Sequence, residues 1–248
     1  MLTIWKRGAV ALAAVLALGA CGGDDDDDVV SETSTTEADQ PATDIAAFCE
    51  ALDFADASAA ELAAAVEAAP MEIRADVTKM ADEDGRAVVQ TGIPGGPSSD
   101  SFYAAAAAVG DYMADNCGYQ VIDVTATDYA FHGVPAEAEA AKTLVRFTND
   151  GTEYHHLAIQ RIRADETRSL EEIMTLPEGG DLLDFQNAAF AAPGQSSWTV
   201  VDLSVAGRYA LMDYVPIGAT TAAVESGQFD DTAPEHWTRG ELAEIQVS

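Results

Sequence analysis

Thiols and imidazoles are the side chains of this sequence best suited to bind metals or to form covalent bonds. The chain has three cysteines and four histidines in 248 residues. No serine, histidine and acidic residue stand in a motif for nucleophilic catalysis, and no Gly-rich phosphate-binding loop is present, so we expect no enzyme activity. The residues that remain for chemistry are Cys21, Cys49, Cys117, His132, His155, His156 and His236.

The charge balance excludes one class of partner. The chain has 43 acidic and 12 basic residues, which gives a formal net charge of -31 at pH 7. Nucleic-acid affinity comes mainly from clustered Lys and Arg that release counterions from phosphates, so we expect no nucleic-acid partner. The same balance disfavours adsorption to anionic lipid head groups.

The amino-terminal segment, residues 1–20, reads as an export signal. Lys6 and Arg7 precede an apolar run from Gly8 to Leu18 that is too short for a mature membrane span. The motif Leu18-Gly19-Ala20-Cys21 resembles the bacterial lipobox, in which the cysteine is acylated and becomes the first mature residue. We therefore expect a lipid anchor on Cys21 at the extracytoplasmic face of the cell membrane, while an ordinary signal peptide cleaved before Cys21 is the alternative.

Two regions follow before residue 121. Residues 21–43 are acidic, lack bases and apolar periodicity, and are expected to form a disordered tether. Residues 44–120 are expected to form a small helical domain, with Pro70 ending one helix and 92–99 forming a loop. Apolar residues recur there at helical spacing in the segments 45–52, 58–69, 71–80 and 100–116.

Cys49 and Cys117 are the two cysteines that remain once Cys21 is used for acylation. Because the exported location permits oxidation, we expect a structural disulfide between them, with a reactive thiol or a metal pair as the alternatives. Phe48-Cys49 and Cys117-Gly118 also bracket the helices as in a domain of exported actinobacterial lipoproteins, which this region resembles.

Residues 121–248 change to the alternating pattern of β-strands. A turn signal at Asn149-Asp150-Gly151 separates two of the runs, and Arg168–Thr175 is expected to be a helix capped by Ser169 or Thr167. The pattern predicts an antiparallel β-sandwich with Greek-key connections, so the whole chain is expected to be an α+β multidomain protein. The strand-like runs are Val121–Ala126, Thr143–Phe147, His155–Ile159, Ser197–Leu203, Arg208–Val215 and Glu241–Val247.

The sequences at 124–162, 191–218 and 236–247 resemble the cupredoxin, or plastocyanin-like, domain of exported bacterial lipoproteins. That resemblance implies a copper site with two histidines, a cysteine and an axial methionine. His155 and His236 stand at the two histidine positions, but Asp213 stands at the cysteine position and Glu241 at the methionine position. Type 1 copper needs a thiolate, and no cysteine follows Cys117, so electron transfer through such a site is not expected.

The alternating strand pattern suggests what the altered pocket does. It places Asp213 on one face with Tyr209 and Leu211, so a buried carboxylate there needs a cationic or metal partner. If His155, Asp213, His236 and Glu241 converge, their donors suit Zn(II) or Cu(II). The alternative is an ion pair between Asp213 and a histidine, with Glu241 in solvent at the mouth. The connection at 218–233 is long, and Glu235 or Asp231 could enter the pocket instead.

The remaining candidates have structural interpretations. His156 is expected to be exposed on the opposite face from His155, and His132 to lie in a loop. Met212 is expected to pack against other side chains and not to bind a metal. Trp198 is expected to pack in the sandwich, and Trp237 to lie at the rim of the site. Two functions follow: a non-redox binding or interaction module for an envelope protein partner, or a protein that binds or delivers divalent Zn or Cu(II). No cofactor is certain.

Overall fold

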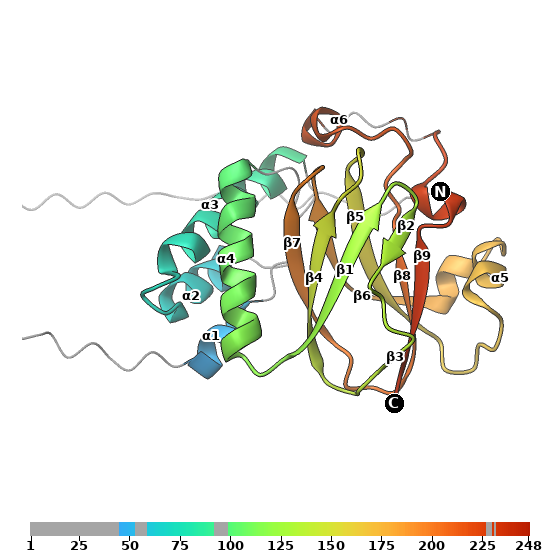
Figure 1. Cartoon of the computed structure of the whole chain (residues 1–248), viewed down its shortest axis with the longest axis horizontal. Helices are drawn as coiled ribbons and strands as arrows, with labels where there is room; N and C mark the ends of the chain where they lie inside the picture. The colour runs from blue at the N-terminus through green and yellow to red at the C-terminus, as the bar shows by residue number, and fades with distance from the viewer. Residues whose placement is uncertain (1–44, 53–58, 92–98, 227–229, 231) are drawn as a thin grey trace, which may run out of the picture. The chain divides into compact units, whose positions relative to one another are not determined.

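The computed structural model describes residues 45–52, 59–91, 99–226, 230 and 232–248, which belong to one compact unit, Gln40–Ser248 (Figure 1). The expected signal peptide, the acylated Cys21, the acidic tether and most of the loop at 92–99 lie outside the described residues. Within them, no helix combines the length and apolar character that crossing a membrane requires.

The helical region contains α1 (Ile45–Ala51), α2 (Ala59–Ala68), α3 (Arg74–Thr91) and α4 (Asp100–Asn116). α4 has the predicted bounds, and Ser99 caps it by accepting a hydrogen bond from the Phe102 N–H. α3 begins three residues later than the predicted Met71 because residues 71–73 form a turn after Pro70. The Arg74 guanidinium donates to the Ala69 carbonyl at 2.7 and 3.1 Å, which satisfies a carbonyl just beyond the end of α2.

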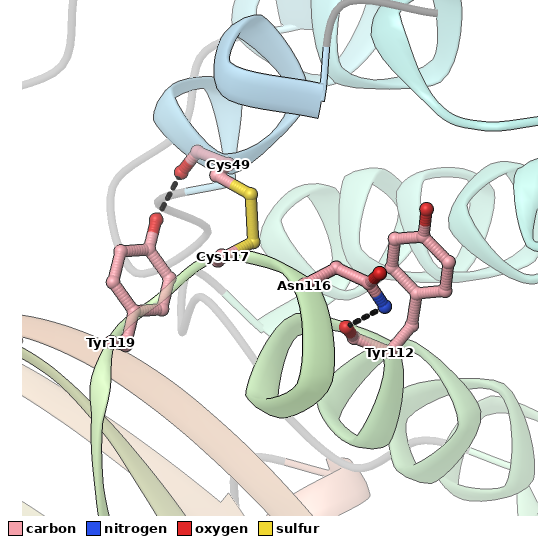
Figure 2. The surroundings of a disulfide bond; sticks show 5 residues. All are labelled: Cys49, Tyr112, Asn116, Cys117 and Tyr119. Carbon is pink, nitrogen blue, oxygen red and sulfur yellow. Dashed lines mark hydrogen bonds between the residues drawn. A yellow bond between two sulfur atoms is a disulfide. The ribbon is translucent and has the colours of Figure 1, made fainter.

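The predicted disulfide between Cys49 and Cys117 is confirmed, with the two Cα atoms 5.6 Å apart (Figure 2). It joins α1 to the residue that follows α4. The Tyr119 hydroxyl donates to the Cys49 carbonyl beside it. Phe48 is buried and packs edge-on against Tyr112, with ring centroids 5.8 Å apart. Covalent and apolar contacts thus hold the short α1 helix against α4.

The strands form two sheets that pack face to face. The predicted sandwich is present, but its sheets are mixed and not purely antiparallel, because β1 pairs with β4 and β3 with β9 in parallel. One sheet has the order β2 (Ala130–His132), β1 (Gln120–Thr127), β4 (Lys142–Asn149), β7 (Ser196–Asp202). The other has the order β3 (Glu137–Ala138), β9 (Leu242–Val247), β8 (Gly207–Met212), β5 (His155–Ile162), β6 (Leu183–Ala191).

The turn signal at Asn149-Asp150-Gly151 does not form a hairpin. β4 and β5 lie in different sheets, so this segment crosses from one sheet to the other. The Asn149 side chain fixes the crossing by donating to the carbonyls of Glu153 and Ala191 at 2.8 and 2.9 Å and accepting from the Gly151 N–H at 2.8 Å. The crossing delivers His155 to the first position of β5.

The space between the sheets is filled by inward-facing apolar side chains. The predicted alternation is confirmed, since Leu157 and Ile159 of β5 and Tyr209 and Leu211 of β8 lie in one buried cluster. On the outer face of the second sheet, Met212 packs as predicted with α5 (Leu170–Met174). Of the two caps predicted for this helix, Ser169 and Thr167, the structure has Ser169, which forms a reciprocal capping box with Glu172. The short helices that remain are η1 (Gly179–Leu182), α6 (Thr221–Ser226) and η2 (His236–Arg239).

Trp198 lies between β7 and α4 and not between the two sheets, which corrects the predicted packing. Its indole N–H donates to the Ala106 carbonyl at 2.8 Å, and it shares a buried cluster with Val109 and Met113. A Cβ atom placed on Gly110 would lie 2.6 Å from Trp198 Cδ1. The close approach of α4 to the first sheet therefore depends on a glycine at position 110.

Gly110→Ala is expected to destabilise the protein by about 1–3 kcal/mol, because the added methyl group overpacks the contact with Trp198. At a helix position with no neighbour in the way, Gly→Ala stabilises a protein by about 1 kcal/mol through helix propensity. The sign of the change in unfolding free energy therefore tells overpacking from helix propensity. Urea unfolding measures it. A free energy of unfolding equal to or above that of the wild type would contradict the close contact.

Candidate metal centre

Four side chains meet at the end of the sandwich where β5 begins and β8 ends. His155 is the first residue of β5 and Asp213 follows β8 directly. His236 is the first residue of η2, and Glu241 lies between η2 and β9. The long connection predicted between Asp213 and His236 closes at its base, because the N–H groups of His236 and Trp237 donate to the Val215 and Asp213 carbonyls, both at 3.0 Å.

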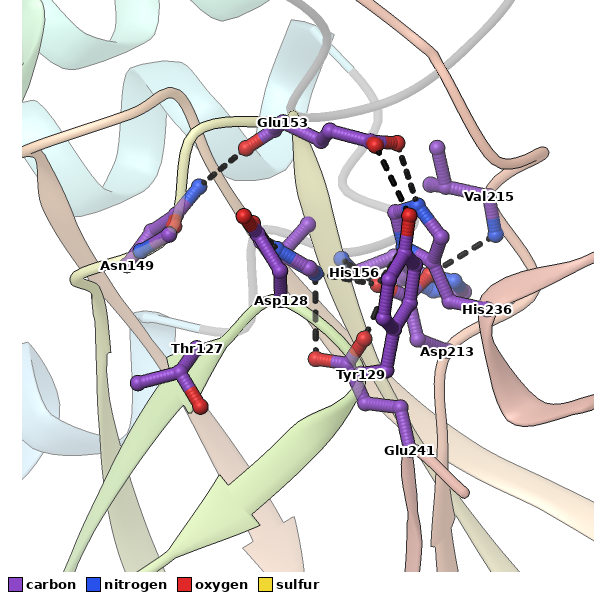
Figure 3. A network of polar contacts seen from close by, with 12 residues as sticks. Thr127, Asp128, Tyr129, Asn149, Glu153, His156, Asp213, Val215, His236 and Glu241 are labelled. Carbon is purple, nitrogen blue, oxygen red and sulfur yellow. Dashed lines mark hydrogen bonds and ion pairs between the residues drawn. The ribbon is translucent and has the colours of Figure 1, made fainter. Parts of the chain in front are cut away.

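The structure brings the four predicted residues together. His155, Asp213, His236 and Glu241 each offer one ligand atom, all within 4.8 Å of one another, and each residue is 0% exposed. The Nδ1 atoms of His155 and His236 lie 2.9 and 2.8 Å from Asp213 Oδ2. Their distances to the Glu241 carboxylate oxygens are 3.0 and 3.6 Å. Figure 3 shows Asp213, His236 and Glu241 in this group. Both imidazoles thus face the same point through the same ring nitrogen.

Asp213 is well supplied with donors. Besides the two imidazoles, the backbone N–H of His156 donates to Oδ2 at 3.1 Å and that of Val215 to Oδ1 at 2.7 Å. Burial acts to raise the pKa of Asp213, but the hydrogen bonds with His155 and His236 leave it lowered. Asp213 is therefore an ionised carboxylate at neutral pH.

Glu241 is in the opposite situation. Both of its carboxylate oxygens are buried, and no hydrogen-bond donor among the described residues is directed at them. His155 Nδ1 is 3.0 Å away, but this nitrogen carries at most one hydrogen and lies nearer to Asp213 Oδ2, at 2.9 Å. Burial is the main reason that the pKa of Glu241 is raised. The alternative that places Glu241 in solvent at the mouth is wrong, because the residue is 0% exposed. The imidazoles nearest to its carboxylate are shared with Asp213.

The two histidines respond to the carboxylates around them. Burial acts to lower the pKa of His155, but Asp213 and Glu241 together raise it to about 10. The pKa of His236 is also raised, against the effect of burial and chiefly by Asp213. In the absence of a cation, hydrogens on the Nδ1 atoms occupy the centre of the group.

Two further carboxylates, absent from the sequence prediction, contact the other edges of the imidazoles. Glu153 Oε2 lies 2.9 Å from His236 Nε2, and Asp128 Oδ1 lies 3.5 Å from His155 Nε2. We call Asp128 and Glu153 the outer carboxylates; their side chains are 35% and 19% exposed. Of the residues expected to intrude, Glu235 instead accepts from the Trp237 indole N–H, and Asp231 lies outside the described residues.

The other sequence candidates do not join the group. His156 points away from it, as predicted, but is half-buried and not exposed, because it stacks on Phe190 with ring centroids 4.2 Å apart. His132 is exposed in strand β2 and not in a loop, and its Nε2 lies 2.9 Å from the Thr127 hydroxyl. Trp237 packs against the cluster of Ile173 and Met212 on the outer face of the sheet, and is not a rim residue.

The donor set decides which ion fits. Two imidazole nitrogens and two carboxylate oxygens are a combination that proteins use for Zn(II) and Cu(II). With both imidazoles neutral, the group carries two negative charges, which a divalent ion balances. A type 1 copper centre does not fit, because the group contains no thiolate.

No protein-family model and no curated protein matches the sequence. Among solved structures, the chain is similar to auracyanin from Roseiflexus castenholzii, with 15% identity and a TM-score of 0.31 over 52% of this chain and 97% of that one. Auracyanin A, a "blue" copper protein from Chloroflexus aurantiacus, gives 12% identity and 0.33 over 53% and 100%. Rusticyanin gives 15% and 0.32 over 52% and 76%. Each TM-score is below 0.5, so the chemistry of the site rests on its own atoms.

Proposed function

We propose that this protein binds one divalent transition-metal ion, Zn(II) or Cu(II), between His155, Asp213, His236 and Glu241, without redox cycling. The observation that carries the proposal is the Glu241 carboxylate, buried with no hydrogen-bond donor directed at either oxygen. A buried carboxylate whose nearest imidazoles are shared with a second carboxylate is costly, whereas a cation at the meeting point of the four side chains would compensate both carboxylates.

The convergence of the imidazoles supports the same proposal. Both Nδ1 atoms face Asp213 Oδ2, at 2.9 and 2.8 Å. An ion at this point takes the place of the Nδ1 hydrogens, and the exchange of two protons for a divalent cation leaves the net charge of the group unchanged. Metal binding is therefore favoured over an interaction module built around a simple ion pair, which would require neither the second imidazole nor Glu241 at 0% exposure.

The location of this function is a second part of the proposal. The lipobox-like motif at Cys21 supports a lipid-anchored protein on the extracytoplasmic face of the cell membrane. An anchored, non-redox site of this kind suits the buffering or delivery of metal ions in the envelope, where an envelope protein would be the recipient. Palmitate labelling and the membrane fraction of Cys21→Ser test the anchor independently of the metal site.

Calorimetric titration of the Cys21→Ser protein with Zn(II) and Cu(II) tests metal binding, since this variant keeps no thiol outside the disulfide. We expect close to one equivalent to bind. The affinity should rise with pH up to about pH 10, because the raised pKa of His155 keeps protons in competition for its imidazole until then. The measured heat of binding should depend on the ionisation enthalpy of the buffer, because metal binding releases protons that the buffer takes up.

Matched histidine variants locate the bound ion. His155→Ala and His236→Ala should each weaken binding by more than about 100-fold, since they remove direct ligands and not merely the groups around them. His132→Ala removes an exposed imidazole and should leave binding unchanged. Absence of binding in the parent protein, or equal effects of the three variants, would overturn the proposal.

A further inference from the structure

Glu153 connects three separate segments around the proposed metal site. Its carboxylate accepts from the Tyr129 hydroxyl at 3.1 Å, from the Gly218 backbone N–H, and faces His236 Nε2 at 2.9 Å (Figure 3). These groups belong to the β1–β2 turn, the connection after β8, and η2. One carboxylate thus links the Tyr129 hydroxyl, the backbone at Gly218 and the outer edge of the His236 ring.

Tyr129 has an unusual backbone conformation for its residue type. It is the second residue of the two-residue turn between Thr127 and Ala130, with φ at 70°, and no other non-glycine residue in the described part of the chain has a positive φ. Glycine or asparagine adopts this conformation at lower cost. The conformation places the Tyr129 ring edge-on to His236, with centroids 5.6 Å apart, and its hydroxyl on Glu153.

We propose that Glu153 is the positioning residue of the metal site, which holds His236 with a hydrogen on Nε2 and the Nδ1 lone pair directed at the ion, and that Tyr129 holds Glu153 in place. This inference rests on the proposed function. A carboxylate that accepts from the remote nitrogen of a ligating histidine fixes both the ring orientation and the tautomer.

Asp128 is the weaker counterpart for His155. Its oxygens accept from the Thr152 N–H and hydroxyl, both at 2.8 Å, while His155 Nε2 is 3.5 Å away, at the outer limit of a hydrogen bond. The 2.9 Å contact makes Glu153 the dominant of the two outer carboxylates. The test therefore uses Glu153.

Glu153→Ala, Glu153→Gln and Asp150→Ala, each in the Cys21→Ser protein, separate positioning from charge. Glu153→Ala should weaken Zn(II) binding by about 10–100-fold. In Glu153→Gln the amide oxygen can still accept from His236 and Gly218, while the Tyr129 hydroxyl can accept from the amide NH₂, so binding should lie closer to wild type. Asp150→Ala removes an exposed carboxylate from the same β4–β5 crossing, and this variant should bind Zn(II) as the wild type does.

Nitrogen NMR of the His236 ring supplies a readout that a purely structural role would not change. In the zinc-loaded wild type the Nε2 hydrogen should exchange slowly with solvent, and in Glu153→Ala it should exchange rapidly at an unchanged melting temperature. Equal affinities of Glu153→Ala and wild type, or of Glu153→Ala and Glu153→Gln, would overturn the inference while the metal site stands. If the wild type binds no zinc, the proposed function fails. In that case, slow exchange of the His236 Nε2 hydrogen in the metal-free wild type and rapid exchange in metal-free Glu153→Ala would still support the role of Glu153 in holding the ring.

Discussion

Asp213→Cys is expected to turn the protein intensely blue on addition of Cu(II), while the wild type stays without such colour. The substitution places a sulfur close to the present Asp213 Oδ2, the atom that lies 2.9 and 2.8 Å from the Nδ1 atoms of His155 and His236. A thiolate and two imidazoles with a weak fourth ligand form the coordination set that gives blue copper its charge-transfer absorption. The backbone N–H groups of His156 and Val215 remain available to donate to the sulfur.

Asp213→Ser is the matched control, because the serine side chain is close to that of cysteine in size but supplies no thiolate. Its copper complex should show no strong visible absorption. Visible spectra of the three proteins, each recorded with one equivalent of Cu(II), decide the outcome. Equal melting temperatures check that the variants fold as the wild type does. A colourless Asp213→Cys that binds copper would mean that the two imidazoles do not converge on position 213. A blue wild type would mean that a cysteine from another part of the chain binds copper.

Removal of the disulfide should produce the largest loss of stability. Cys49 and Cys117 are separated by 68 positions, so the bridge restricts most of the helical region in the unfolded chain. The chain-entropy relation gives a stabilisation of about 4 kcal/mol for a loop of this length. The double variant Cys49→Ala/Cys117→Ala should lose about that amount in urea unfolding. The helices share a buried cluster with Trp198 and Val200, so the loss should extend to the sandwich.

A reductant provides the internal comparison for this measurement. It should lower the unfolding free energy of the wild type to that of the double variant and leave the double variant unchanged. Zn(II) affinity at low temperature should survive in both, because none of the four proposed ligands lies in helices α1 to α4, which the disulfide joins. An unchanged midpoint in the double variant would contradict the stabilising role of the bridge.

Local patterns predicted much of the fold. The bounds of α4 followed from helical spacing, and the burial of Leu157, Ile159 and Leu211 followed from strand alternation. β6 was not predicted, because Asn187 and the alanines around it have low strand propensity; pairing with β5 holds them in the sheet. The parallel pairing of β1 with β4 was also missed, since a turn signal indicates where a chain reverses locally and not which sheet it enters.

The inner and outer parts of the candidate site differ in how far the sequence predicts them. The four inner residues could be selected because their positions correspond to ligand positions in a family that the sequence resembles. Asp128 and Glu153 have no such correspondence, and both lie in turns where acidic residues are common. Only the positive φ of Tyr129 and the crowding at Gly151, where a Cβ would lie 2.7 Å from His155 Nε2, reveal that these turns are shaped around the histidines.

The connection between Asp213 and His236 has a consequence for recognising relatives of this site. It is held at its base by the backbone bonds from His236 to Val215 and from Trp237 to Asp213, and by a bridge between Pro216 and Glu235. Insertions or deletions between α6 and Asp230 would not remove these contacts, so the spacing of the two ligands along the chain carries little constraint. A search pattern with fixed intervals would therefore pass over related sites, whereas a three-dimensional template of two Nδ1 atoms and two carboxylates would retrieve them.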